Sequence, residues 1–260
     1  MPSTPPDSEA WRFPNRATPI GSPNYYAVRF SPESQRDRNA GLIAWYELVQ
    51  GIADRPLDPG VARLKLDWWR DELERLGARQ ARHPLALALQ DYLPDPRVLQ
   101  PMQAILEAAE ADVRAPQPLD DLAFGQACRN SFGQFFVLLA ALEPAAYFDR
   151  QRCIEAGGYC AAVERIRRLT EAPHRVPADL APRSLGRLDA ARRRVRLQRL
   201  FDQFVALGPN HGARNPPFAD RLLALASATH KKMRCKGYPV TDRLIERAPV
   251  AHLWTAWRCC

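Results

Sequence analysis

Apolar residues recur through most of the chain at intervals of three and four, the spacing of amphipathic helices. Leu42, Trp45 and Val49 illustrate the pattern, between a helix start at Pro32 and a helix stop at Pro56. The same spacing predicts further helices over 59–77, 84–92, 96–113, 119–142, 145–170, 184–207, 216–236 and 249–257. No segment alternates with the two-residue period of a strand. The pattern therefore predicts an all-α, single-domain bundle of about eight to ten helices.

The composition at the two ends of this pattern predicts the limits of the domain. Residues 1–22 hold five prolines together with Ser, Thr and Asp, which is typical of a disordered tail. Residues 23–260 are predicted to form the helical domain. Within it, the segment 119–142 is apolar on nearly every side towards its end, which indicates a central helix of the bundle.

The overall composition is that of a soluble globular protein, with 46% hydrophobic and 25% charged residues. No apolar run approaches the ~18 residues of a membrane span. The N-terminal residues also lack the apolar core of a secretory signal. We therefore expect a cytoplasmic protein.

A formal net charge of +8 favours an anionic partner: nucleic acid, a diphosphate or an acidic membrane surface. The basic clusters at 165–168, 191–196 and 231–236 have no aromatic ladder, recognition helix or zinc finger beside them, so we expect no nucleic acid. The run 192–196 is either a solvated helix face or a surface for anionic lipid headgroups. The second alternative would place the protein peripherally at the inner face of the membrane.

The cysteines and histidines show no metal-binding spacing. None of the six cysteines forms a CxxC pair, so they are predicted to be reduced and mostly buried thiols. The terminal pair Cys259–Cys260 has a second interpretation as an exposed redox or lipidation site. The five histidines are scattered, and we expect surface or helix-capping positions for them. No phosphate-binding loop or nucleophile motif is present.

Two acidic residues on one predicted helix form the first candidate site. Glu47 and Asp54 are seven residues, or two turns, apart, so both side chains can lie on the same face. Gln50 occupies the intermediate position, four residues before Asp54. The pattern is either a metal-binding carboxylate motif that lacks one member or the polar side of a core helix.

Several longer stretches carry a likeness to a known family. The run SPNYY begins at residue 22, LDWWRDEL covers 66–73, and His83–Pro84 follows. The chain ends on RLLALASATHKKMRCKG and VAHLWTAWR. Over about 22–258 these stretches resemble squalene and phytoene synthases, which are head-to-head prenyltransferases of the all-α isoprenoid synthase fold. The resemblance implies that fold, prenyl diphosphate substrates, and two or three Mg²⁺ ions held by two aspartate-rich motifs.

The resemblance also implies roles for residues outside these motifs. Ser22, Tyr25 and Tyr26 are candidate substrate contacts. Anchoring of the first helix is an equal alternative for the two tyrosines. Trp68 and Trp69 fall at helical spacing with apolar neighbours and are predicted to be packing residues.

The first aspartate-rich motif of the family aligns with QGIAD at 50–54. Gln50 and Gly51 replace two aspartates, and Asp54 remains, with Glu47 one turn earlier. A neutral amide is a poor Mg²⁺ ligand beside a carboxylate, and glycine offers no side-chain ligand. The motif is therefore predicted to have lost most of its metal ligands.

The second motif falls on AVERIRRLTEAP at 162–173, where Arg168 alone matches the family pattern. Arg165 and Leu169 stand where the family has Asn and Asp, and a slipped register offers the acids Glu164 and Glu171. Arginines interleaved with acids pair with them or repel a metal cation. This motif is predicted to be more degenerate than the first.

Two functions follow from the resemblance. The first is a pseudo-enzyme that needs no cofactor and binds a prenyl lipid or a protein partner; assembly factors of this fold associated with respiratory complex I similarly lack full aspartate motifs. The second is an active prenyltransferase for farnesyl or geranylgeranyl diphosphate with altered metal use. Its single Mg²⁺ would be held by Glu47, Asp54 and Glu164. Its phosphate-binding arginines would be Arg36, Arg165 and Arg168.

Overall fold

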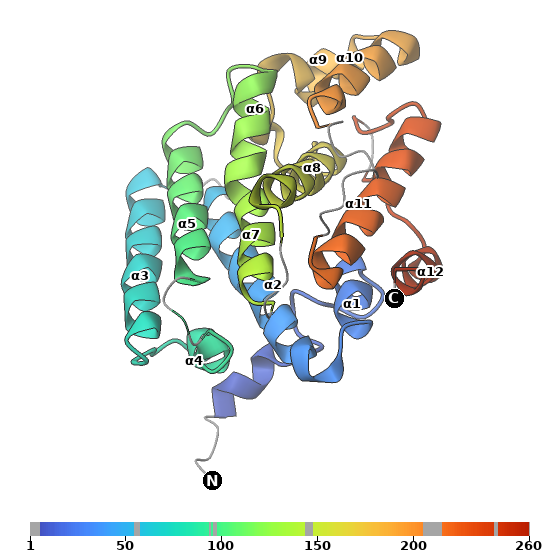
Figure 1. The fold of residues 1–260 in the computed structure, drawn as a ribbon. Helices are drawn as coiled ribbons and strands as arrows, with labels where there is room; N and C mark the ends of the chain where they lie inside the picture. Colours follow the sequence, from blue (N-terminus) through green and yellow to red (C-terminus); the bar gives the residue numbers. More distant parts are fainter. Residues whose placement is uncertain are drawn as a thin grey trace.

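The computed structural model describes residues 6–54, 58–93, 95, 98–143, 148–204, 215–241 and 244–259. These residues form helices joined by turns, and no β-strand occurs among them (Figure 1). The prediction of an all-α fold is confirmed.

The helices lie close to the positions that the sequence pattern predicts. The first part of the chain contains η1 (Pro6–Trp11), α1 (Pro23–Arg29), α2 (Glu33–Asp54), α3 (Pro59–Gly77), α4 (Pro84–Gln90) and α5 (Leu99–Arg114). The second part contains α6 (Asp121–Cys128), the π-helical turn η3 (Arg129–Gly133), α7 (Gln134–Ala141), α8 (Arg150–Arg167), the 3₁₀ turns η4 (Pro173–Arg175) and η5 (Ala178–Leu180), α9 (Pro182–Gly186), α10 (Ala190–Asp202), α11 (Pro217–Cys235) and α12 (Pro249–Trp257). Proline opens several of these helices, where its missing N–H costs nothing and its fixed φ suits the first turn.

Helices α2, α5, α7 and α8 pack through the middle of the molecule (Figure 1). Helix α3 packs against α5 on one side, and α11 packs against α8 on the other. Two clusters of buried apolar side chains meet at α8. One cluster extends through α2, α3, α5 and α7, and the other lies between α6, α8 and α10. Because α8 contributes to both clusters, its position fixes the candidate residues that it carries.

The predicted helix over 119–142 is divided into α6, η3 and α7, and α8 crosses it at η3. A Cβ atom on Gly157 of α8 would collide with the carbonyl oxygen of Phe132 and lie 2.7 Å from Cα of Gly133. A Cβ on Gly133 would lie 2.7 Å from the carbonyl oxygen of Ile154. The two backbones therefore approach to a distance that only glycine permits.

The segment 6–22, predicted to be part of a disordered tail, is folded in the structure. Ala17 is buried, and the backbone N–H of Phe13 donates to Asp37 of α2 at 2.9 Å. The aromatic rings of Trp11 and Phe13 pack against the main core. The high proline content predicted disorder, but these apolar residues bury enough surface for the segment to fold. Residues 1–5 lie outside the described residues.

The tryptophan-bearing helix α3 is tied to α4 through a buried carboxylate. Glu72 accepts hydrogen bonds from the backbone N–H groups of Arg82, at 2.6 Å, and His83, at 2.7 Å. It also accepts one from Nε of Arg75 at 2.8 Å. The imidazole Nδ1 of His83 accepts from the N–H of Leu85 and so caps α4. This pairing explains why the tryptophan helix is followed by His-Pro.

The prediction for the histidines is confirmed at His83 but is wrong for two others. His230 is half-buried, with its two ring nitrogens 2.8 and 2.7 Å from tyrosine hydroxyls, and His252 lies on the buried face of α12. Burial lowers the pKa of each of these two side chains to about 4, so both rings are neutral at physiological pH. His174 is half-buried in η4, and His211 lies outside the described residues.

The cysteine prediction holds for the part of the chain that the structure describes. Three thiols are buried: Cys128, Cys153 and Cys160. Cys235 is exposed and Cys259 partly exposed, while Cys260 lies outside the described residues. A helix able to span a bilayer does not occur among the described helices.

Candidate functional site

The C-terminal half of α2 and the end of α8 face a buried arginine that follows them in the chain. Arg175, the last residue of η4, has a side chain that is only 3% exposed. Its Nε lies 3.2 Å from Oδ1 of Asp54 on α2, and its Nη2 lies 2.7 Å from Oδ2 of Asp112 on α5. Nη2 also donates to Oε1 of Gln50 at 3.2 Å. One guanidinium therefore joins three segments that are distant in the sequence.

A second arginine completes this arrangement. Nη2 of Arg165, on α8, lies 3.3 Å from Oδ2 of Asp112, and both side chains are almost fully buried. We call Asp54, Asp112, Arg165 and Arg175 the arginine–aspartate cluster. It contains two buried cations, one buried anion and the half-exposed Asp54, so most of the buried charge is paired within the protein.

The arginines of the cluster are permanent cations. Burial lowers the pKa of Arg175, as does the neighbouring Arg165, while Asp112 and Asp54 act in the opposite direction. Burial also lowers the pKa of Arg165, but Cys128 and Asp112 outweigh it and hold that pKa above its ordinary value. Because a guanidinium titrates far above physiological pH, both groups stay protonated. The two arginine side chains between α2 and α8 are therefore positively charged at every physiological pH.

Nε of Arg175, although it lies 3.2 Å from Asp54, makes no hydrogen bond to it, and three further donors in this region have no acceptor within the described residues. They are Nε2 of Gln50, Nη1 of Arg165 and Nη1 of Arg175. A buried donor without an acceptor costs free energy, and it is usually satisfied by an ordered water or a ligand oxygen. The cluster can therefore accept further oxygen atoms, and it favours those of an anion.

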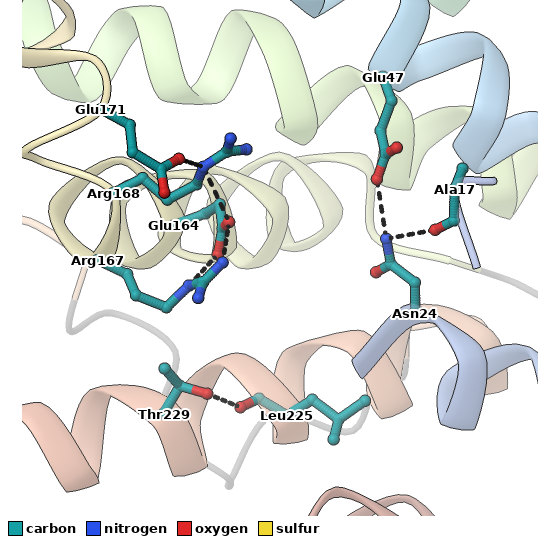
Figure 2. Close-up of polar contacts among 9 residues, drawn as sticks. All are labelled: Ala17, Asn24, Glu47, Glu164, Arg167, Arg168, Glu171, Leu225 and Thr229. Carbon is teal, nitrogen blue, oxygen red and sulfur yellow. Dashed lines mark hydrogen bonds and ion pairs between the residues drawn. The ribbon is translucent and has the colours of Figure 1, made fainter. Parts of the chain in front are cut away.

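Glu47 lies two turns before Asp54, at the edge of this region. Nδ2 of Asn24 donates to its Oε1 at 3.1 Å and to the carbonyl oxygen of Ala17 at 3.2 Å (Figure 2). Partial burial of the carboxyl group and the facing Glu164 raise the pKa of Glu47 to about 7, whereas Arg168 lowers it. Because the residue is also exposed to solvent, water screens part of this effect.

Glu164, on the last turn of α8, is engaged by arginines of the same helix end. Arg167 donates to both of its carboxylate oxygens, at 2.8 and 2.6 Å (Figure 2). Arg168 lies 4.0 Å from it and donates to Glu171 at 2.6 Å. These are exposed or half-exposed pairs, so each contributes little to stability. Their consequence is that the acids at this helix end already have cationic partners.

Replacing Glu47 by Gln is expected to stabilise the protein above pH 7 but not at pH 5. The raised pKa means that ionisation of Glu47 penalises the folded state as the pH rises from its unfolded value towards 7. Gln retains the hydrogen bond from Asn24 without the charge. Chemical denaturation at pH 5 and pH 8 measures the difference, with the exposed Glu74→Gln as control. An equal effect of Glu47→Gln at both pH values would contradict the raised pKa of Glu47.

An open pocket of about 370 Å³ adjoins Glu47 between α2 and α3. Its walls are mainly apolar and are formed by Glu47, Leu48, Gly51, Ile52, Val61, Leu64, Lys65, Trp68 and Trp69. Trp69 is buried, as predicted for a packing residue, but Trp68 is 43% exposed at this pocket. The difference arises because Trp68 faces outward with the exposed Val61 and Leu64 rather than into the core. The volume is within the ~300–1,000 Å³ range of small-molecule sites.

The remaining candidate substrate contacts have local partners. Oγ of Ser22 accepts from the N–H of Tyr25 and caps α1. The ring of Tyr25 stacks on Phe13 with 5.2 Å between centroids and meets Tyr26 edge-on. Arg36 donates to a backbone carbonyl just before α2. It lies about 27 Å along that helix from Asp54, at ~1.5 Å per residue. The structure therefore does not bring Arg36 to the cluster.

Comparison with known proteins identifies the family. The model of the squalene/phytoene synthase family matches residues 18–175. The chain belongs to the squalene/phytoene synthase family. Among solved structures, the squalene synthase HpnC from Alicyclobacillus acidocaldarius is similar, with a TM-score of 0.64 and 20% identity over 89% of this chain and 94% of that one. This match supports the isoprenoid synthase fold. No curated protein sequence matches the chain.

The residues at the family's metal-motif positions do not fit Mg²⁺. Asp54 is paired with Arg175, and the neutral Gln50 accepts from the same guanidinium. Leu169, at an aspartate position of the second squalene/phytoene synthase motif, is fully buried in the apolar cluster around α8. The described residues contain no group of three or more His, Cys, Asp or Glu side chains placed to hold a metal ion. Mg²⁺ prefers several hard oxygen ligands, and two buried cations here would repel it.

Asp112 and Arg175 are the site residues that sequence reasoning missed. Asp112 lies on the apolar stripe of α5 that includes Met102, Ile105 and Ala109. An acid on a buried helix face requires a partner, so this position held a usable signal. Arg175 gave no comparable signal, because its partners come from distant segments.

Proposed function

We propose that this squalene/phytoene synthase-family protein is a pseudo-enzyme that binds a prenyl lipid without a Mg²⁺–diphosphate centre. The observation that carries the proposal is Arg175, whose guanidinium lies between Asp54, Gln50 and Asp112. In this arrangement a protein cation takes the place that a metal would need beside the remaining acid of the first motif.

Departure of a diphosphate from a prenyl chain leaves a carbocation and an anion with several charges. Stabilising that anion during bond cleavage requires cations placed directly on its oxygens in a dry site. Arg165 and Arg175 already share Asp112, and Arg175 also pairs with Asp54, so much of their charge is neutralised within the protein. The cluster is suited to hold an anionic group rather than to drive its departure.

The pocket between α2 and α3 supplies the apolar part of the proposed ligand site. Leu48, Ile52, Val61 and Leu64 offer aliphatic contacts of the kind that a prenyl chain buries. Burial and the facing Glu164 raise the pKa of Glu47 at its edge, which favours the protonated form of this carboxyl group. This weakens its repulsion of an anionic lipid head.

A second candidate function is an active prenyltransferase with altered metal use. The unpaired donors of Gln50, Arg165 and Arg175 favour it, because guanidinium groups can hold phosphate oxygens bidentately without a metal. In that case Glu47 and Glu164 would be the acids available to one Mg²⁺. The two candidates differ in whether pyrophosphate is released.

The experiment measures pyrophosphate release and melting temperature in the same samples, with farnesyl or geranylgeranyl diphosphate and with or without Mg²⁺. The pseudo-enzyme proposal expects no release and a lipid-induced rise in melting temperature. Leu64→Asp, in the pocket, is expected to abolish that rise, whereas Leu122→Asp, which is similarly exposed on α6, is expected to retain it. Mg²⁺-dependent release would favour the second candidate. If the samples showed no pyrophosphate release and no rise in melting temperature, lipid binding would be overturned and a protein partner would be favoured.

A further inference from the structure

Helix α12 presents an apolar stripe to solvent. Val250, Leu253, Trp254 and Trp257 follow the i, i+3, i+4, i+7 pattern of a single helix face, and they are 74%, 42%, 56% and 53% exposed. We call these four residues the α12 stripe. The opposite face of the helix is buried against α11 and α1 (Figure 1). In an ordinary surface helix the apolar stripe faces the core, so this orientation calls for something outside the chain to cover it.

The apolar surface continues beyond the helix. Ile20 is 78% exposed, and its neighbour Gly21 lies beside Pro249, the first residue of α12. Within the stripe, the rings of Trp254 and Trp257 are 5.2 Å apart. The patch thus combines two large aromatic groups with three aliphatic side chains from two separate segments.

The charged residues of the segment that carries the stripe are arginines, and the exposed Glu246 lies just before it. From Arg247 to Cys259 the chain carries arginine at both ends of the helix, Arg247 and Arg258, and no acid. Arg258 is exposed directly after Trp257. The adjoining helix α11 ends in a basic segment whose exposed members are Lys231, Arg234 and Lys236. This distribution complements a surface of negative charge.

We propose that the α12 stripe docks on the surface of an anionic phospholipid bilayer. An amphipathic helix with aromatic residues on its apolar face and cations at its edges lies in the headgroup region, with the stripe against the acyl chains. Tryptophan suits that position because its ring is apolar and its N–H is polar. The stripe is too short to cross the bilayer, so the contact is peripheral. This inference is independent of the proposed lipid pocket, which lies between α2 and α3.

The test is binding of the full chain to vesicles that contain about a quarter phosphatidylglycerol, compared with neutral phosphatidylcholine vesicles. We expect flotation with the anionic vesicles, a blue shift of tryptophan fluorescence, and weakening at about 0.5 M salt. Trp254→Ser/Trp257→Ser is expected to lower the vesicle partition coefficient at least about a hundredfold, since each buried ring contributes more than ~1.4 kcal/mol, or about tenfold. Because the side chains of Trp254 and Trp257 are exposed, the melting temperature of this double variant should match that of the unaltered protein.

The matched control is Leu119→Ser/Leu122→Ser, which removes two apolar side chains near the start of α6 that are more exposed than the two tryptophans. It is expected to bind vesicles like the unaltered protein. Equal loss in both variants, or no flotation of the unaltered chain, would overturn the proposal. So would a dimer in solution that the tryptophan substitutions dissociate, because a second copy would then cover the stripe.

Discussion

Replacing Asp112 by Asn is expected to destabilise the protein by about 3–5 kcal/mol, the range found when one partner of a buried ion pair is removed. Asp112 is the carboxylate shared by Arg165 and Arg175. Asn has a similar shape but no charge, so two buried guanidinium groups would be left with the half-exposed Asp54 as their remaining anion in the cluster. Thermal unfolding should register a fall of roughly 10 °C, since ~1 kcal/mol shifts a chain of this size by ~2–4 °C.

The control for this experiment is Asp91→Asn, which breaks the exposed ion pair between Asp91 and Arg79. That pair spans 3.0 Å but is open to water at both ends, so its loss is expected to change stability by less than ~1 kcal/mol. If the two substitutions had equal effects, the cluster could not be the buried electrostatic centre described above.

Replacing Gly157 by Ala is expected to destabilise the protein by about 3 kcal/mol, at the upper end for overpacking. The added methyl group would meet backbone atoms of Phe132 and Gly133, which cannot rotate away as a side chain would. The steric clash can therefore be relieved only if α8 moves away from η3, and this movement displaces Arg165 as well. Chemical denaturation measures the loss, and circular dichroism at low denaturant checks that the helices remain.

Gly51→Ala is the matched control, because Gly51 is also within a helix but a Cβ added to it would meet no atom within 4 Å. Alanine is the better helix former, so this change is expected to stabilise the protein by about 0.5–1 kcal/mol. Opposite signs for the two substitutions would support the close crossing of α8 and η3. Stabilisation by both would contradict it.

The fold could be predicted from the sequence because helical periodicity is a local property. The spacing of Leu42, Trp45 and Val49 is sufficient to predict α2, and tertiary packing does not change it. Local composition was misleading at 6–22, where prolines suggested disorder. There, Trp11 and Phe13 find their partners only in the folded chain.

The candidate site could be predicted only in part. Sequence reasoning gave pairing of Glu164 with arginines of its own helix end as one of two alternatives, and the structure shows those partners three and four residues away. It could not predict that Asp54 pairs with Arg175, because that contact depends on how η4 turns back towards α2. Long-range ion pairs leave little trace in local spacing, apart from a polar residue such as Asp112 on an apolar stripe.

The Mg²⁺ dependence of the stability of Asp54→Ala tests whether Arg175 replaces a metal ion beside Asp54. If Arg175 takes the place of the metal beside Asp54, the substitution removes one half-exposed ion pair and costs about 1 kcal/mol. Thermal unfolding of the unaltered and substituted chains, each with and without Mg²⁺, then gives the same difference in both conditions. A difference that grows by several degrees when Mg²⁺ is present would mean that Asp54 holds the metal, and would contradict the account.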